Sequence, residues 1–227
     1  MINLGAEDSM ESSRRGELAF NDASICYQGW QSCSSCHPDG RSDGLNWDQL
    51  NDGIGNPKNT KSLLFSHQTP PSMITGIREN AKIAVRKGMS FMLGTSLKEQ
   101  VAVDIDNYLK GMTPIPSPYL VNGKLSTSAK RGEKLFEKSQ CSLCHSGKHF
   151  TDGKSYIVHS KTDDSPNTPY DTPTLREVWR TAPYLLDGRA TTIQQVLREH
   201  NADNRHGDTQ GLSIAEIDNL TEYILSL

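Results

Sequence analysis

The chain has 227 residues, which suits one large domain or two small ones, and its formal net charge is −3. This small charge gives no reason to expect a nucleic-acid partner, and no stretch is long and apolar enough to predict a transmembrane segment. Only 34% of the residues are hydrophobic and the mean hydropathy is −0.60, which predicts a thin protein core.

The first half carries the pentapeptide Cys33-Ser34-Ser35-Cys36-His37, shortly after Arg15-Gly16-Glu17-Leu18. Cys-x-x-Cys-His is the attachment signal for c-type haem. Two thiols at this spacing can lie on one face of a turn and add to the two vinyl groups of a porphyrin, and the adjacent histidine can bind the iron. We therefore expect Cys33 and Cys36 to hold a haem and His37 to be its proximal ligand.

A closing amphipathic helix is predicted for the first half from an apolar stripe between Val101 and Leu109, with Ser96 and Glu99 as its capping box. The stretch before this helix contains Met89 and Met92, whose thioethers are candidates for the distal ligand. Apolar packing against the porphyrin explains the two methionines equally well. His67 is a further candidate.

Prolines at alternate positions in Thr113-Pro114-Ile115-Pro116-Ser117-Pro118 predict an extended linker. We place an N-terminal domain at residues 1–112, the linker at 113–126 and a C-terminal domain at 127–227.

The second half repeats the pattern of the first. Arg131-Gly132-Glu133 precedes Cys141-Ser142-Leu143-Cys144-His145, which predicts a second haem c held by Cys141 and Cys144 with His145 as the proximal ligand. His206 lies in a loop before the closing helix, and we expect it to be the distal ligand, with His200 as the fallback. The closing helix is predicted from an apolar stripe between Ile214 and Ile224, with Ser213 and Glu216 as its capping box.

Zinc is the main alternative for the four motif cysteines, but zinc-binding cysteine pairs usually lie about 15–20 residues apart. Here a large part of the chain separates the two pairs, and a redox Cys-x-x-Cys would not need the following histidine twice. Two covalent haems therefore fit best, and their apolar surface would complete the thin core. We predict an all-α fold of two tandem cytochrome c-like domains, each around one haem. With both sites loaded, Cys26 has no partner in the chain, and whether it is buried, free or bonded to another molecule stays open.

Several segments of the second half resemble the bacterial di-haem cytochrome c peroxidases and MauG-type proteins. They are Asp171-Thr172-Pro173-Thr174-Leu175-Arg176, Thr181-Ala182-Pro183-Tyr184 and Asp187-Gly188-Arg189. The resemblance implies that one haem handles electrons, that the other reacts with peroxide, and that Arg176 pairs with a haem propionate. Residues 43–48 and 66–71 look closer to a branch found in cell-surface proteins. The family's catalytic glutamate is not evident, because no acidic residue occurs between Asn80 and Lys98, so no catalytic residue is assigned.

We therefore expect a di-haem c-type cytochrome that transfers electrons between redox partner proteins or small electron donors and acceptors. The first alternative is a di-haem peroxidase or MauG-like oxidoreductase, which the open question of the distal ligand at Met89 or Met92 leaves in play. Peroxide cleavage needs an acid-base group over the iron, and its absence favours electron transfer. The second is a haem module appended to a larger surface protein. Haem c is attached outside the cytoplasm, so a periplasmic or cell-surface location is expected. Because no signal peptide is recognisable at Met1, we expect a mature form or the C-terminal part of a longer exported polypeptide.

Overall fold

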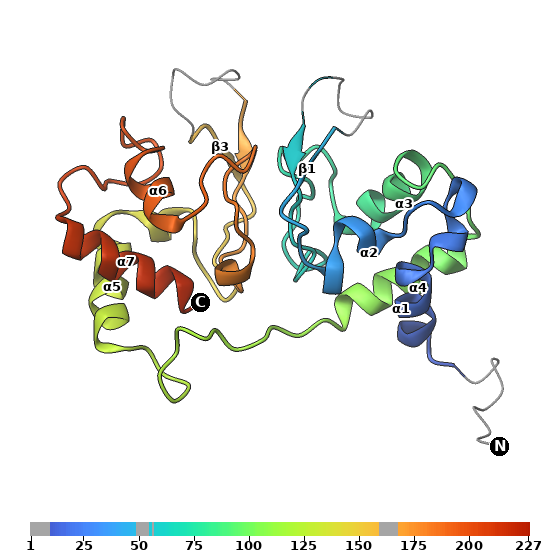
Figure 1. The fold of residues 1–227 in the computed structure, drawn as a ribbon, viewed down its shortest axis with the longest axis horizontal. Coiled ribbons are helices and arrows are strands. Elements are labelled where there is room, and N and C mark those ends of the chain that lie inside the picture. The colour runs from blue at the N-terminus through green and yellow to red at the C-terminus, as the bar shows by residue number, and fades with distance from the viewer. Residues whose placement is uncertain (1–9, 49–54, 56, 159–167) are drawn as a thin grey trace.

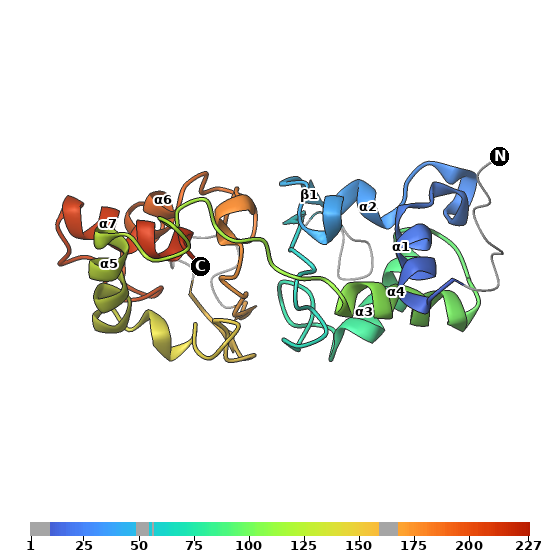
Figure 2. The ribbon, with the colours of Figure 1, turned by 90° about the horizontal axis from the view of Figure 1, so that it is seen from below.

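The structure, a computed structural model, describes residues 10–48, 55, 57–158 and 168–227. Two lobes lie next to each other, and an extended segment, residues 113–126, passes along both and joins them (Figures 1 and 2). We call the described residues up to 112 the first lobe and residues 127–227 the second lobe. No helix of the described part of the chain is long and apolar enough to cross a membrane.

Each lobe is built from helices and one short antiparallel strand pair. The first lobe contains α1 (Ser12–Asn21), α2 (Cys33–Cys36), α3 (Ala81–Phe91), α4 (Glu99–Lys110), the strands β1 (Asn46–Trp47) and β2 (Lys58–Asn59), and the 3₁₀ turns η2 (Ala23–Ile25), η3 (Tyr27–Gly29) and η4 (Pro38–Gly40). The second lobe contains α5 (Thr127–Lys138), α6 (Ile193–Arg198), α7 (Ile214–Leu225), the strands β3 (Ser155–Tyr156) and β4 (Tyr170–Asp171), and the 3₁₀ turns η6 (Cys141–Leu143) and η7 (Val178–Arg180).

A close crossing of the first and last helices organises each lobe, and a glycine makes it possible. A Cβ added to Gly16 of α1 would lie 1.9 Å from the carbonyl oxygen of Asp104 in α4. A Cβ added to Gly132 of α5 would lie at the same distance from the carbonyl oxygen of Asn219 in α7. The Arg-Gly-Glu repeat of the sequence therefore marks equivalent helix crossings in the two lobes.

One of the two predicted capping boxes is confirmed. Ser213 caps α7, and the side chain of Glu216 accepts from the Ser213 backbone N–H at 2.9 Å. The prediction of a capping box at Ser96 is wrong, because Lys98 is the N-cap of α4 and no side chain caps the start of this helix. The Glu99 carboxylate pairs instead with Arg86 of α3.

The second lobe has the larger apolar core. Its buried members are Ala129, Leu135, Phe136, Val178, Ile193, Leu197, Ile217, Leu220, Tyr223 and Ile224. The corresponding cluster of the first lobe has only Phe20, Ile105 and Leu109 buried, with partly buried side chains packed around them. The predicted thin core is therefore most evident in the first lobe.

Buried polar contacts hold the two lobes together. Arg41 of the first lobe forms a bidentate ion pair with Glu177 of the second, with nitrogen–oxygen distances of 2.8 and 2.9 Å. The Arg41 guanidinium also donates to the carbonyl oxygen of Thr113, and the Glu177 carboxylate accepts from the backbone N–H of Ile115. Both lobes and the connecting segment therefore meet at one buried ion pair.

Candidate haem-binding sites

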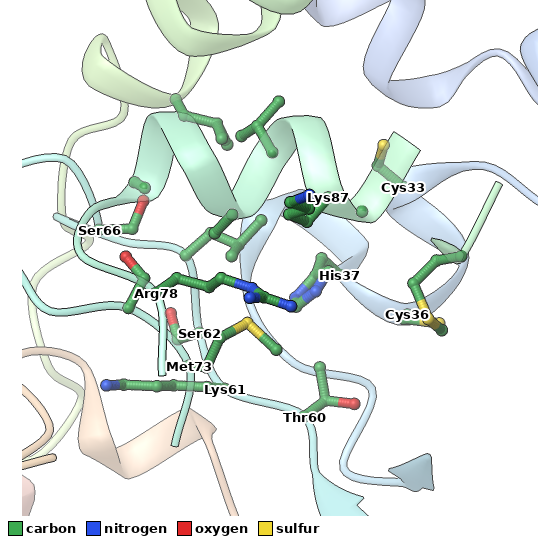
Figure 3. A pocket seen from close by; sticks show the side chains of 18 of the residues that line it. Cys33, Cys36, His37, Thr60, Lys61, Ser62, Ser66, Met73, Arg78 and Lys87 are labelled. Atoms are coloured by element: carbon green, nitrogen blue, oxygen red, sulfur yellow. The ribbon is translucent and has the colours of Figure 1, made fainter. Parts of the chain in front are cut away.

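The first motif lies at the wall of a cavity in the first lobe. α2 is one turn long, and Ser32 and Ser35 close a capping box at its start. This turn sets Cys33 and Cys36 on the cavity wall, with His37 directly after them (Figure 3). Neither cysteine is in a disulfide, and burial raises the pKa of both thiols to about 11. Both are thus protonated thiols at neutral pH.

His37 is held in one tautomer by the backbone. Its Nδ1 lies 3.0 Å from the carbonyl oxygen of Arg41, which can only accept, so Nδ1 carries the proton. The other ring nitrogen, Nε2, keeps its lone pair. Burial lowers the pKa of His37, so the ring is neutral, as a metal ligand must be.

The first cavity has a volume of about 210 Å³ and largely apolar walls. Met89 and Met92, the two methionines proposed from the sequence, both line it, and Met89 is buried in α3. Met73 also lines it, a third thioether that sequence reasoning missed. A signal was available, because Met73 follows Thr69-Pro70-Pro71 as Leu185, which lines the second cavity, follows Thr181-Ala182-Pro183.

The helix crossings fix the register between the lobes. Asp104 and Asn219 occupy the same position, the sixth residue, of α4 and α7. His206 lies seven residues before Ser213, the N-cap of α7 (213 − 206 = 7), and seven residues before Lys98, the N-cap of α4, lies Phe91. Phe91 is 52% exposed and has no metal-binding atom. Counted forward from Asn80 and Thr192, the N-caps of α3 and α6, His206 corresponds instead to Gly94, because this part of the first lobe is three residues shorter (98 − 80 = 18 against 213 − 192 = 21). Neither position of the first lobe has a side chain that binds a metal.

His67 is engaged elsewhere. Its Nε2 lies 2.9 Å from a carboxylate oxygen of Asp106 in α4, and both side chains are buried. The second oxygen of Asp106 accepts from Arg86 at 2.8 Å. His67 is thus part of a buried polar cluster and is not among the residues that line the first cavity.

The second motif begins at η6, after Gln140 in the left-handed region, and lines a cavity of about 450 Å³. The Nδ1 of His145 lies 3.1 Å from the carbonyl oxygen of Phe150, so this histidine has the same tautomer as His37. Burial lowers the pKa of His145 and raises that of Cys141 to about 11. The donor atoms thus repeat those of the first lobe.

The structure brings His206 opposite His145. The two rings are tilted by 39° and their centroids are 6.2 Å apart. A metal–imidazole bond of about 2 Å puts each ring centroid about 3 Å from the metal, so two rings on one metal lie roughly 6 Å apart. The pKa of His206 is lowered to about 4 by burial and by His145, which leaves both rings neutral.

Asn201 holds the His206 loop, and sequence reasoning missed it. This side chain is 1% exposed, and its Oδ1 accepts from the His206 backbone N–H at 2.8 Å. Its Nδ2 donates to the Gly207 carbonyl oxygen and to the Thr209 hydroxyl, both at 2.8 Å. These hydrogen bonds lie within the loop and stabilise its conformation. His200, the fallback ligand, also lines the cavity, one residue before Asn201.

Arg176 lies at the same cavity. Its Nε donates to the Lys148 carbonyl oxygen at 3.1 Å, and its guanidinium lies over the Phe150 ring at 4.7 Å from the centroid. Phe150 also supplies the carbonyl oxygen that holds His145. Arg176 thus steadies the loop of the proximal histidine and presents a positive charge at the cavity.

The residues of both cavities fit haem c. Each cavity offers two unpaired thiols at the required spacing and a buried neutral imidazole whose Nδ1 carries the proton. No cluster of three or more acidic, cysteine or histidine side chains suited to a bare metal ion occurs among the described residues. The donor set therefore suits a covalently held porphyrin better than zinc. Cys26, the fifth cysteine, is buried and free.

Comparison with known proteins agrees with this donor set. Residues 129–227 match the cytochrome c family. The hydrazine synthase subunit gamma of Kuenenia stuttgartiensis is 27% identical to this chain, across 96% of it and 78% of the relative. The methylamine utilization protein MauG of Methylophilus methylotrophus is 22% identical, across 94% of this chain and 80% of the relative. In sequence, this chain is thus similar to the MauG-like di-haem cytochrome c peroxidases.

Solved structures show the same fold. A chain of K. stuttgartiensis hydrazine synthase superposes with a TM-score of 0.86 at 23% identity, covering 100% of this chain and 98% of that one. The di-haem peroxidase BthA of Burkholderia thailandensis superposes with a TM-score of 0.65 at 16% identity, covering 95% and 85%. This MauG-like chain therefore has a mostly helical cytochrome c-like fold with little sheet, and it binds haem c. The resemblance read from its sequence is confirmed.

Proposed function

We propose that this chain is an electron-transferring di-haem c-type cytochrome with one haem in each lobe. Cys33 and Cys36 would hold the first haem and Cys141 and Cys144 the second, with His37 and His145 as proximal ligands. Haem iron supplies a reversible one-electron carrier. The protein binds the porphyrin in apolar walls, fixes the imidazole tautomers and limits the access of water.

The distance between His145 and His206 carries this proposal. A separation of 6.2 Å between ring centroids suits two imidazoles on one iron. An iron with two protein ligands has no free position for a substrate, and such a site transfers electrons. The buried hydrogen bonds of Asn201 would hold His206 in place in both redox states.

The partners follow from the same chemistry. We propose that redox proteins or small electron donors and acceptors exchange electrons with the second haem. One relative is by name a subunit of an enzyme, which supports a role as one component of a larger assembly or polypeptide. Because haem c is attached outside the cytoplasm, we place the protein in the periplasm or at the cell surface.

Visible and EPR spectra of the haem-loaded chain, oxidised and reduced, test the proposal. We expect two haems per chain by pyridine haemochrome and a low-spin ferric signal from the second haem that peroxide leaves unchanged. One haem per chain, or a high-spin second haem, would contradict the proposal.

The first lobe favours a second candidate, reaction of a small molecule at the first haem. The first lobe has no histidine at the positions that correspond to His206, which are Phe91 when counted from α4 and Gly94 when counted from α3. A peroxidase would need an acid-base group there, yet no Asp or Glu is among the described residues that line the first cavity. A high-spin signal that peroxide consumes would favour the peroxidase, whereas a high-spin signal indifferent to peroxide would favour another ligand.

A further inference from the structure

The first cavity is lined by positive charge. Its charged side chains are Lys58, Lys61, Arg78 and Lys87, and no carboxylate lines it in the described part of the chain. The second cavity differs, because Asp171 and Glu199 are among its lining residues together with its cations. A haem in the first cavity would therefore lie against a wall that contributes cations and no carboxylate in its described part.

Arg78 is the cation without a partner. Lys61 pairs with Asp171 across the lobes, and Lys87 lies over the Phe91 ring at 5.7 Å from the centroid. The Nε of Arg78 is enclosed and has no hydrogen-bond partner among the described residues. Arg78 is only partly buried, but arginine keeps its charge in a protein and its enclosed Nε is a donor without an acceptor, which costs free energy. An anion in the cavity would supply that acceptor.

The position of Arg78 shows where that anion would bind. Its backbone pairs with Ser72 in both directions, at 2.8 and 3.3 Å, just before α3. From there the side chain extends across the cavity towards His37, from the wall opposite Cys36 (Figure 3). His37 would bind the iron of a haem in this cavity, so the Arg78 guanidinium would lie close to that haem.

We propose that Arg78 makes the first haem pocket a binding site for a small inorganic anion of the size of azide, nitrite or fluoride. This inference rests on the proposed presence of haem in the first lobe and names the ligand class of that site. The guanidinium offers several N–H donors in a fixed plane, which suits an anion better than a neutral molecule. A cation in this place also differs from the acid that peroxide cleavage needs, because it cannot accept a proton.

Ligand titrations of the full haem-loaded ferric protein test this site. The dissociation constants of azide and of neutral imidazole are measured from the visible spectrum of the first haem. In Arg78→Gln we expect the azide constant to rise about ten- to a hundredfold, from loss of a charge-assisted hydrogen bond, and the imidazole constant to stay within about twofold. Lys82→Gln, which removes an exposed cation on α3 outside the cavity, is the matched control and should change neither constant.

Arg78→Lys provides the second variant should Arg78→Gln fail to retain haem. Lysine keeps the charge but loses the planar fork, so the azide constant should rise several-fold while the imidazole constant stays the same. Equal azide constants in wild type and both variants would overturn the proposal and assign Arg78 to a haem propionate. Parallel weakening of azide and imidazole would also overturn it, as would a first haem that binds neither ligand.

The same samples separate this inference from the proposed function. Haem content and the low-spin signal of the second haem are recorded before each titration. Loss of either in the wild-type protein would count against the proposed cytochrome. Two haems with an intact second signal but unchanged azide binding in the variants would count against the anion site alone.

Discussion

Two carbonyl oxygens decide which nitrogen of each motif histidine is free to bind iron. The carbonyl oxygens of Arg41 and Phe150 accept hydrogen bonds from the Nδ1–H groups of His37 and His145, so Nε2 is the nitrogen with a lone pair for a metal. Both carbonyls come from loops that a side chain fixes: Arg41 by its ion pair with Glu177, and Phe150 by the overlying Arg176. The surroundings of the proximal histidines are thus specified several residues beyond each motif.

His206→Ala should leave both haems attached but make the second haem high-spin. The thioethers and His145 are untouched, and only the imidazole facing His145 is lost. Visible and EPR spectra check this, with His200→Ala as the control that should keep the low-spin signal. A low-spin second haem in His206→Ala would show that another residue is the ligand.

Single substitutions can show which of the three methionines of the first cavity, if any, is the distal ligand of the first haem. Met73→Leu, Met89→Leu and Met92→Leu keep most of the volume and remove one thioether each. If one of them is the distal ligand, its variant alone loses the low-spin signal of the first haem and shows a lower reduction potential. Unchanged spectra in all three would assign the methionines to packing.

At the scale of the helices, the α1–α4 and α5–α7 crossings leave no room for a side chain at Gly16 and Gly132. Gly132→Ala would force a Cβ against the carbonyl oxygen of Asn219, and α5 and α7 would have to separate. We expect a loss of about 1–3 kcal/mol in the free energy of unfolding, measured by denaturant titration. Gly211→Ala, where an added Cβ meets nothing within 4 Å, is the control. Equal stability of the two variants would mean that the crossing has room to relax.

The α1–α4 contact has an acid-sensitive charge where the α5–α7 contact has a neutral amide. Arg15 pairs with Asp104, and at the equivalent place Arg131 donates to Asn219. The hydrogen bonds from Arg15 and other groups lower the pKa of Asp104 to about 2 from its ordinary value of 3.8. Because the folded-state pKa is the lower one, this contribution to stability is complete above about pH 4 and is lost as the pH falls towards 2.

Asp104→Asn should therefore reproduce the arrangement of the second lobe. It should lower the free energy of unfolding by about 1–3 kcal/mol at pH 7, and this difference should shrink between pH 4 and pH 2. Denaturant titrations at several pH values check this. A difference between wild type and variant that stays constant over that range would show that Asp104 does not titrate there.

At the scale of the whole molecule, the Arg41–Glu177 pair couples the lobes to the segment between them. Glu177 is 1% exposed and has a positive φ of 59°. Its carboxylate is therefore buried where the two lobes meet. The backbone carbonyl oxygen of Arg41 also accepts the hydrogen bond from Nδ1 of His37. The lobe contact and the surroundings of the first haem are thus linked through one residue.

Glu177→Gln should cost about 3–5 kcal/mol in the free energy of unfolding, because it leaves the buried Arg41 without a counter-charge. We also expect the reduction potential of the first haem to change more than that of the second. Redox titration and denaturant unfolding measure the two effects. Glu17→Gln, which breaks an exposed pair with Arg14, is the control and should cost at most about 1 kcal/mol. A Glu177→Gln variant as stable as this control would refute the coupling.

The sequence by itself determined what depends on neighbours along the chain. The Cys-x-x-Cys-His spacing predicted each attachment site, the Ser213 capping box predicted the start of α7, and the repeated Arg-Gly-Glu pointed to equivalent places in two halves. Local spacing suffices here because one turn of backbone brings these groups together. The failed box at Ser96 shows the limit, since Lys98 begins α4 and Glu99 is held by Arg86, a residue of another helix.

Only the tertiary structure decided which residues meet across the cavities and between the lobes. The Asn201 network places His206 opposite His145, and the chain before α3 directs Arg78 into the first cavity. The Arg41–Glu177 pair joins residues 136 positions apart. Such contacts depend on how distant elements pack, and no spacing within the sequence encodes that packing.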